Sequence, residues 1–495
     1  MKQKMNCGHK YDKEDWVAIL DFGSQYTYII ARRVRECGVY SEIVPYNIDA
    51  HQLLARAPKA IILSGGPASV TSTGSLMCHR DIFTIGVPTL GICYGAQLMA
   101  KTLGGRVVKA KAREYGKVTL QIKSGEGLFK GLSSKETIWM SHGDRISRLP
   151  KGFRIIGATE NSPIGAMENK ARRLYGLQFH PEVVHTPKGK KILKNFLYHL
   201  ADCRPSWSIH SFVKNSINEL KERIGREKVL CGLSGGVDSS VLAILLHKAI
   251  GKNLIAMFID NGLLRKDEVT LVKRRFKNHC GINLRVVNAQ DTFLNGLRGV
   301  KNPERKRKTI GRLFIEVFER EVKKLGKIKF LAQGTLYPDV IESRSPWGGP
   351  SATIKTHHNV GGLPPHLKFE LIEPLKYLFK DEVRLVGKEL GLPDEIVYRQ
   401  PFPGPGLAVR VVGAITKERL NVLREADWIL MDEIKHANLY RKLWQSFCVL
   451  LPAKTVGVMG DKRSYENVLA IRAVTSEDAM TAHWARLPYE LLERV

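Results

Sequence analysis

The chain has 495 residues, which is too long for one ordinary domain, so we expect two or three. Its 43% hydrophobic and 25% charged residues exclude a disordered or collagen-like chain. The formal net charge of +30 favours acidic partners such as phosphates. Its basic clusters lack the interleaved aromatic residues of base-stacking surfaces, so we do not expect a nucleic acid partner.

The beginning of the chain and its cysteines bear on location. Residues 1–15 form an extension that lacks the apolar core of a secretion signal. No later segment offers about 18 uncharged apolar residues, so no membrane association is expected. The eight cysteines include no C-x-x-C pair. Reduced thiols and a cytoplasmic location fit this pattern.

Residues 16–205 predict an α/β domain with a mainly parallel sheet. Apolar strands at 16–22, 39–44, 60–66 and 88–95 alternate with amphipathic helical stretches such as 25–37, which is typical of parallel β-α-β units. Three β-rich segments follow at 117–123, 136–144 and 172–182. We expect them to add antiparallel strands at one edge of the sheet.

Two further domains are expected. Residues 206–398 predict a second α/β domain, with strands at 228–233, 254–262, 284–289 and 329–335. A stretch rich in glycine and proline, residues 347–365, interrupts it and is a candidate mobile lid. Residues 399–495 predict a third, smaller α+β domain, with a helical region at 416–451 and strands at 454–461 and 468–476.

The first candidate for chemistry is Cys93, in the string GICYG. This string follows a buried strand and precedes a helix, which is the setting of a nucleophile elbow. The glycines allow a sharp turn that exposes the side chain, and the N-terminus of the following helix favours the thiolate. Taken alone, a buried structural cysteine is an equal alternative.

A histidine and a carboxylate complete a possible triad. In FHPE, His180 ends a strand and Glu182 lies two residues on, on the same side of an extended chain. A thiol nucleophile needs a base and a group that orients the base. The backbone N–H groups of Tyr94 and of Gly65 or Gly66 are candidate donors to an oxyanion, although SGGP is also an ordinary turn. The motifs SGGP, GICYG and FHPE, in this order, resemble class I glutamine amidotransferases.

The second candidate is a phosphate cradle. The string SGGVDSS follows a strand and opens a helix, so its amides and hydroxyls form an anion site, without the lysine of a Walker A motif. It resembles the PP-loop of ATP pyrophosphatases, which implies a PP-loop adenine-nucleotide α-hydrolase-like domain. The residues implied to bind ATP are Ser234, Gly235, Gly236, Val237, Asp238, Ser239, Ser240 and, at the end of a neighbouring strand, Asp260. Asp238 also fits a helix first turn, and the segment around Asp260 fits an Asn-Gly turn; with ATP bound, Asp238 is the candidate Mg²⁺ ligand.

The acceptor is indicated by four further segments. QGTLYPDVIES, IKTHHNVGGLP, FKDEVR and RQPFPGPGLA resemble the GMP synthetase family, and the likeness runs from about residue 17 to the last residue. It implies that glutamine, xanthylate (XMP) and ATP, with Mg²⁺, yield GMP, AMP and pyrophosphate. The residues it implies at the XMP site or its lid are Arg307, Asp339, Glu342, Lys355, His357, His358, Lys380 and Gln400.

The family pattern continues past residue 495 into a tail that contacts the xanthylate phosphate. Because a charged hydrogen bond contributes roughly 1.5–3 kcal/mol, weaker nucleotide binding is expected of this chain. The third domain, truncated by this comparison, carries the dimer interface of the family, so a homodimer is expected. Two alternatives stay open: an impaired, degenerate or RNA-associated remnant, and a PP-loop amidotransferase with another acceptor, such as an NAD precursor.

Overall fold

The computed structural model describes residues 15–342, 369–459, 462–476 and 482–495. The chain separates into two compact units, residues 1–211 and 212–495. Among the described residues, no helix is long and apolar enough to cross a membrane.

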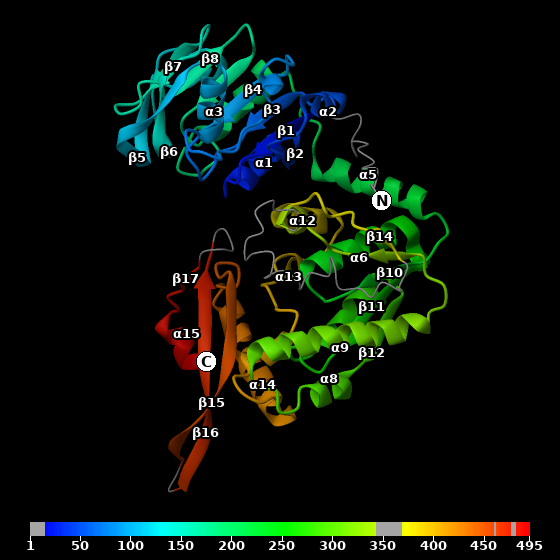
Figure 1. The fold of residues 1–495 in the computed structure, drawn as a ribbon. Coiled ribbons are helices and arrows are strands. Elements are labelled where there is room, and N and C mark those ends of the chain that lie inside the picture. Colours follow the sequence, from blue (N-terminus) through cyan, green and yellow to red (C-terminus); the bar gives the residue numbers. More distant parts are fainter. Residues whose placement is uncertain (1–14, 343–368, 460–461, 477–481) are drawn as a thin grey trace. The chain divides into compact units, whose positions relative to one another are not determined.

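The first unit is built on a nine-stranded sheet with the order β2-β1-β3-β4-β9-β8-β7-β5-β6 (Figure 1). Its strands are β1 (Trp16–Asp21), β2 (Tyr40–Pro45), β3 (Ala60–Leu63), β4 (Thr89–Ile92), β5 (Arg106–Ile122), β6 (Lys135–Arg148), β7 (Arg154–Ala158), β8 (Ala166–Asn169) and β9 (Leu174–Leu177). Strands β2, β1, β3, β4 and β9 pair in parallel, and β8, β7, β5 and β6 continue the sheet in antiparallel pairing. The predicted parallel sheet is confirmed, and so is the antiparallel edge for residues 117–123 and 136–144. The expectation is wrong for residues 172–182, because β9 lies in the middle of the sheet and pairs in parallel with β4.

The parallel strands of this unit are buried on both faces, which explains their nearly continuous apolar sequences. The helices are α1 (Thr27–Glu36), α2 (Ala50–Ala55), α3 (Tyr94–Thr102) and α4 (Gly189–Lys194), followed by the π-helical turn η3 (Asn195–Leu200). Asp49 caps α2 by accepting hydrogen bonds from the backbone N–H groups of His51 and Gln52, both at 3.0 Å. Helix α5 (Ile209–Ile224) leads into the second unit.

The second unit contains a five-stranded, fully parallel sheet with the order β12-β11-β10-β13-β14. Its strands are β10 (Val229–Gly232), β11 (Leu254–Asp260), β12 (Leu284–Asn288), β13 (Phe330–Ala332) and β14 (Glu370–Ile372). Its helices include α6 (Val237–Ile250), α7 (Glu268–Val272), α8 (Gln290–Gly296), α9 (Pro303–Lys323), α10 (Tyr337–Glu342), α12 (Lys380–Glu389) and α13 (Asp394–Val397). Asn302 caps α9, and Pro303 occupies its first position, where a missing N–H costs nothing.

The last part of the chain forms the short helix η6 (Gly406–Arg410), helix α14 (Lys417–His436) and the antiparallel strands β15 (Gln445–Met459), β16 (Lys462–Thr475) and β17 (His483–Trp484), before α15 (Tyr489–Arg494). One apolar cluster joins this part to the parallel sheet domain, with Phe293 and Val317 packed together with Leu407, Leu430 and Leu450. The apolar core is therefore continuous across the domain boundary predicted between residues 398 and 399. This boundary stays a prediction.

The helix predicted over residues 416–451 is wrong in its last part. Helix α14 ends at His436, the chain turns at Asn438 with a φ of 55°, and strand β15 begins at Gln445. From Ser446 to Leu450 buried and half-buried residues alternate, which is the period of a strand with one face on a core. The apolar run SFCVLL is too short to show whether its period is that of a helix or that of a strand. The sequence therefore did not exclude a helix here.

Candidate active sites

Cys93 lies at a sharp turn between β4 and α3. Its φ of 51° and ψ of −106° are rare for a residue with a side chain, and such strain persists only where the surroundings hold it. A Cβ on Gly95 would lie 2.4 Å from the carbonyl oxygen of Leu63. A Cβ on Gly91 would lie 2.6 Å from the backbone nitrogen of Ala96. The two glycines of GICYG are therefore required by close packing, and the turn presents the thiol at the N-terminus of α3.

His180 and Glu182 follow β9 and form a buried pair. The imidazole Nδ1 lies 2.7 Å from Oε1 of Glu182, and the two residues are 3% and 0% exposed. The backbone of His180 is held from both sides: Thr186 Oγ1 donates to its carbonyl at 2.6 Å, and its N–H donates to the carbonyl of Trp139 at 3.0 Å. The carboxylate accepts from Nδ1–H, which orients the ring and leaves Nε2 as the other functional nitrogen.

The charge of this histidine depends on its two neighbours. Burial opposes protonation of the imidazole, but the negative charge of Glu182, followed by charge and hydrogen-bond interactions with Cys93, raises the pKa of His180 well above its ordinary value. Cys93, His180 and Glu182 are thus coupled electrostatically as well as placed together. The arrangement can accept a proton from a thiol and hold it for a leaving group.

The predicted oxyanion donors lie beside the triad. A Cβ on Gly65 would be 3.3 Å from Cε1 of His180, so the turn after β3 passes next to the imidazole. Gly66 packs against Tyr94, where an added Cβ would be 3.0 Å from the ring. The Gly95 N–H donates to the carbonyl of Ser64 at 3.1 Å and ties the two turns together. The backbone segments chosen from the sequence are therefore adjacent, and their role as oxyanion donors stays a prediction.

The other cysteines in the described part of the chain differ from Cys93. All seven described cysteines are free, so none forms a disulfide there. Burial raises the pKa of Cys78, Cys203, Cys231 and Cys448 to about 12, which keeps these thiols protonated and unreactive. None of these four has the backbone conformation of Cys93. The conformation and the buried histidine favour a nucleophile at Cys93 over a structural cysteine.

Glu182→Gln should slow glutamine hydrolysis by on the order of 100-fold or more, because an amide no longer stabilises the imidazolium or selects its tautomer. Removing the carboxylate also lowers the pKa of His180, because the negative charge of Glu182 is the largest influence that raises it. The group that titrates in kcat/KM for glutamine should therefore move to lower pH. Steady-state rates measured across pH check both points, and an unchanged pH profile would contradict the assignment of Glu182.

The phosphate cradle of the second unit joins β10 to α6. Gly235 has a φ of 75°, and Gly236 caps the helix. The hydroxyl groups of Ser239 and Ser240 both donate to the carbonyl of Gly236, at 3.1 and 2.7 Å. Ser234 closes the loop, because its N–H donates to Ser239 Oγ at 3.2 Å. This loop presents backbone N–H groups and the positive end of α6 to an anion.

Asp238 lies in the first turn of α6, with Gly236 rather than Asp238 at the N-cap. Its two carboxylate oxygens accept hydrogen bonds from Nζ of Lys380 at 2.7 and 2.5 Å. Lys380 begins α12, so this ion pair joins the segment FKDEVR to the phosphate loop. A carboxylate at this place has the oxygen chemistry that Mg²⁺ requires, and a lysine beside it suits phosphate.

Asp260 and Gln400 are held by the protein itself. The carboxylate of Asp260 accepts from Gly262 N–H at 3.0 Å and from Gln290 Nε2 at 2.7 Å. Gln400 is 4% exposed, and its amide oxygen accepts from both the N–H and the hydroxyl of Ser446, at 2.8 and 2.9 Å. Its amide nitrogen donates to the carbonyl of Tyr440 at 3.1 Å. Contact of Gln400 with XMP, which stays a prediction, would require these bonds to exchange.

The remaining predicted residues lie on three elements. Arg307 is on α9, half-exposed, 3.6 Å from the carboxylate of Glu304. Asp339 is on α10, where it accepts from Leu336 N–H at 3.0 Å, and Glu342 ends that helix. The first turn of α10 lies close to Lys380, since Tyr337 N–H donates to Leu378 O at 3.0 Å. The predicted lid residues Lys355, His357 and His358 lie outside the described residues.

An interaction that sequence reasoning missed links the phosphate loop to the rest of the unit. Arg399 donates to Glu268 in a bidentate pair at 2.5 and 2.7 Å and to the carbonyl of Gly235 at 2.8 Å. A Cβ on Gly235 would lie 2.9 Å from the Glu268 carboxylate, so the ion pair leaves room only for glycine at position 235. Arg399 opens the string RQPFPGPGLA, but no local pattern pairs it with Glu268, because the two residues are 131 positions apart.

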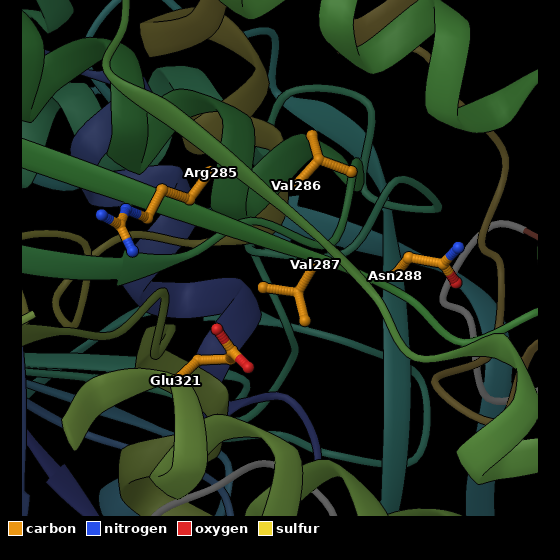
Figure 2. Close-up of a pocket in the computed structure, with 5 residues that line it drawn as sticks. All are labelled: Arg285, Val286, Val287, Asn288 and Glu321. Carbon is orange, nitrogen blue, oxygen red and sulfur yellow. The ribbon is translucent and has the colours of Figure 1, made fainter. Parts of the chain in front are cut away.

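A hollow with a volume of about 420 Å³ lies on the outer strand β12. Figure 2 shows the residues that line it: Arg285, Val286, Val287, Asn288 and, from α9, Glu321. None of the predicted site residues lines it. Across the described ranges, no group of three or more histidine, cysteine, aspartate or glutamate residues could hold a metal by itself.

The first unit has the fold of a class I glutamine amidotransferase, and the second has the fold of an ATP-binding PP-loop domain. Residues 18–200 match the family described as "Glutamine amidotransferase class-I", residues 208–303 match "NAD synthase", and residues 432–495 match "GMP synthase C terminal domain". The chain belongs to the family of glutamine-hydrolysing GMP synthases.

This membership rests on similarity along nearly the whole chain. A GMP synthase [glutamine-hydrolyzing] from Carboxydothermus hydrogenoformans is 57% identical over 97% of this chain and 94% of its own length. Relatives with the same description from Alkaliphilus metalliredigens and Acetivibrio thermocellus are each 55% identical, over 98% and 97% of this chain and 94% and 93% of their own lengths.

Proposed function

We propose that this chain makes GMP from XMP, ATP and glutamine, with AMP, pyrophosphate and glutamate as the other products. The observation that carries the proposal is the coupled set of Cys93, His180 and Glu182 in the same chain as a PP-loop cradle. The family membership supports the same acceptor. Two such sites in one polypeptide are explained if the ammonia that the first releases from glutamine is the nitrogen source for the ATP-dependent reaction of the second.

In the first unit, the thiolate of Cys93 attacks the side-chain amide carbon of glutamine. His180 takes the thiol proton and returns it to the departing nitrogen, which leaves as ammonia. The negative oxygen of the tetrahedral intermediate is held by the N–H groups of Tyr94 and Gly65. Water then attacks the thioester, again with His180 as base, and the products are glutamate and the free thiol.

In the second unit, residues 234–240 hold the phosphates of ATP, and the C2 oxygen of XMP attacks the α-phosphorus. The bond to pyrophosphate breaks, and an adenylylated XMP results. Ammonia then attacks C2, the bond from C2 to the adenylyl oxygen breaks, and GMP and AMP are released. Asp238, with the phosphates, fits a Mg²⁺ ion, which would neutralise charge on the pyrophosphate group as it leaves. Lys380 would then turn from Asp238 to phosphate oxygens.

The XMP site is assigned to Arg307, Asp339, Glu342, Lys380 and Gln400. The proximity of α10 to Lys380 supports this grouping for Asp339. We also propose a homodimer formed through the β15–β16 hairpin. Exposed apolar residues on that hairpin support it: Val456 is 59% exposed, Tyr465 62% and Ile471 40%. A cytoplasmic location fits the free cysteines.

Release of pyrophosphate from ATP should depend on XMP. Purified protein with ATP, Mg²⁺ and ammonium should release pyrophosphate and AMP in equal amounts with GMP when XMP is added. Nicotinate adenine dinucleotide is the matched alternative acceptor, because residues 208–303 match NAD synthase. Stimulation by that compound alone would reverse the assignment, and glutaminase activity without any acceptor-dependent ATP cleavage would indicate an impaired synthetase half.

A further inference from the structure

A buried polar cluster lies in the amidotransferase unit away from the triad. Glu114 on β5 is 3% exposed, and its carboxylate accepts from Thr159 Oγ1 at 2.9 Å and from Ser162 Oγ at 2.6 Å. The second oxygen also lies 3.4 Å from Nε2 of His142, which is 5% exposed. Burial opposes ionisation of this carboxyl, but hydrogen bonds from His142, Ser162 and Thr159 outweigh it and lower the pKa of Glu114.

Stability alone is a weak reason for such a group. A buried carboxylate has to recover several kcal/mol of lost hydration, and apolar residues of the same volume often serve a core equally well. The cluster is also placed at an irregular point of the sheet. The pairing of β5 with β6 shifts between Lys109 and Glu114, and Glu114 opposite His142 is the first pair of the ladder that continues from the shift. The Glu114–His142 contact therefore secures the end of a ladder.

The strand secured in this way runs beside the nucleophile. The carbonyl of Ser141, directly before His142, lies 3.8 Å from Sγ of Cys93 and accepts its hydrogen bond. The carbonyl of Asp144, two residues after His142, accepts from Gln97 Nε2 at 2.9 Å, and Gln97 lies on α3 just after the elbow. His142 is thus the anchored residue between two contacts that β6 makes with the Cys93 elbow.

We propose that Glu114 is a positioning residue for glutamine hydrolysis: through His142 it holds the segment 141–144 of β6 against Cys93. The inference rests on the proposed role of Cys93. Glu114 does not touch the thiol or the substrate. It acts by setting the position of the Ser141 carbonyl beside the sulfur of Cys93. A displacement of about 1 Å in such a contact can lower the rate by on the order of 100-fold.

Glu114→Gln keeps the shape but replaces one acceptor oxygen with a donor group that faces hydroxyl or imidazole donors. We expect kcat for glutamine to fall by roughly 10- to 100-fold, mainly in kcat rather than KM, while ammonium-driven GMP formation by the same sample stays unchanged. The rate of alkylation of Cys93 by iodoacetamide should change in parallel. Glu126→Gln is the matched control, since Glu126 lies in the same unit with its carboxylate 72% exposed and paired only at the surface.

A melting temperature that falls while kcat and the alkylation rate match those of the wild type would overturn the proposal, because a purely structural role has that signature. If Glu114→Gln does not fold, Ser162→Ala removes one donor only. We expect it to lower kcat about threefold or more, and an unchanged kcat in that folded variant would also overturn the proposal. A wild-type protein without glutaminase activity would instead refute the proposed function, and the comparison of Cys93 alkylation rates would still decide whether Glu114 positions the thiol.

Discussion

Cys93→Ala should lose glutamine-driven GMP formation by on the order of 10⁴-fold or more, while formation driven by ammonium continues at the wild-type rate. The amide carbon then has no nucleophile within the elbow, and neither His180 nor Glu182 can substitute for the covalent step. Residues 234–240, which we propose to bind ATP, belong to the other compact unit, so the substitution leaves them intact.

The test compares initial rates of GMP formation with glutamine and with ammonium in the same preparation. Cys203→Ala is the control for loss of a buried thiol in this unit, because burial raises the pKa of Cys203 to about 12 and it has no part in the triad. That variant should keep both activities. Glutamine-driven turnover that survives in Cys93→Ala would show that the nucleophile is elsewhere.

The second large effect is expected at Arg399, in the string RQPFPGPG. Its side chain is 13% exposed and that of Glu268 is 7% exposed. Burial opposes the charge of the guanidinium, but the charge and hydrogen bonds of Glu268 outweigh it and raise the pKa of Arg399. Removing one member of such a pair leaves an uncompensated buried charge, which typically costs about 3–5 kcal/mol of folding free energy.

Arg399→Met should therefore lower the stability of the second unit and abolish most XMP-dependent ATP cleavage. The carbonyl of Gly235 loses its donor, and the loop that cradles the phosphates is no longer held in the conformation with positive φ. We expect a loss of 100-fold or more in kcat/KM for ATP, on the order of the penalty for a misplaced binding group. Glutaminase activity of the first unit should persist.

Pyrophosphate release and chemical unfolding measure the two effects separately. Adding Glu268→Gln to Arg399→Met removes the unpaired charge, so it should recover part of the stability without recovering ATP use. Arg312→Met is the matched control, because Arg312 forms a surface pair with Glu316 at 2.5 Å with both side chains more than half exposed, and such pairs contribute little. Normal ATP kinetics in folded Arg399→Met would mean that the pair does not shape the loop.

Most of the strands and helices could be located from the sequence, because apolar strands that alternate with amphipathic helices are compatible with few folds. The helix predicted over residues 416–451 was wrong for residues 437–451, the last seven of which lie in strand β15. There a short apolar run has no clear period, and only its alternating burial against the core of the second unit made it a strand. The strands β7, β8, β14 and β17 were not predicted.

The sequence by itself determined which local strings are the candidates for chemistry and in which order they occur. GICYG, FHPE and SGGVDSS are local strings in which turn, helix terminus and side chain are neighbours, so backbone geometry alone places Cys93 and the phosphate cradle. Only the tertiary structure decided what supports them. Glu114 with Ser162 and Glu268 with Arg399 lie 48 and 131 residues apart, and such pairs form only where tertiary packing removes water and brings distant segments of the chain together.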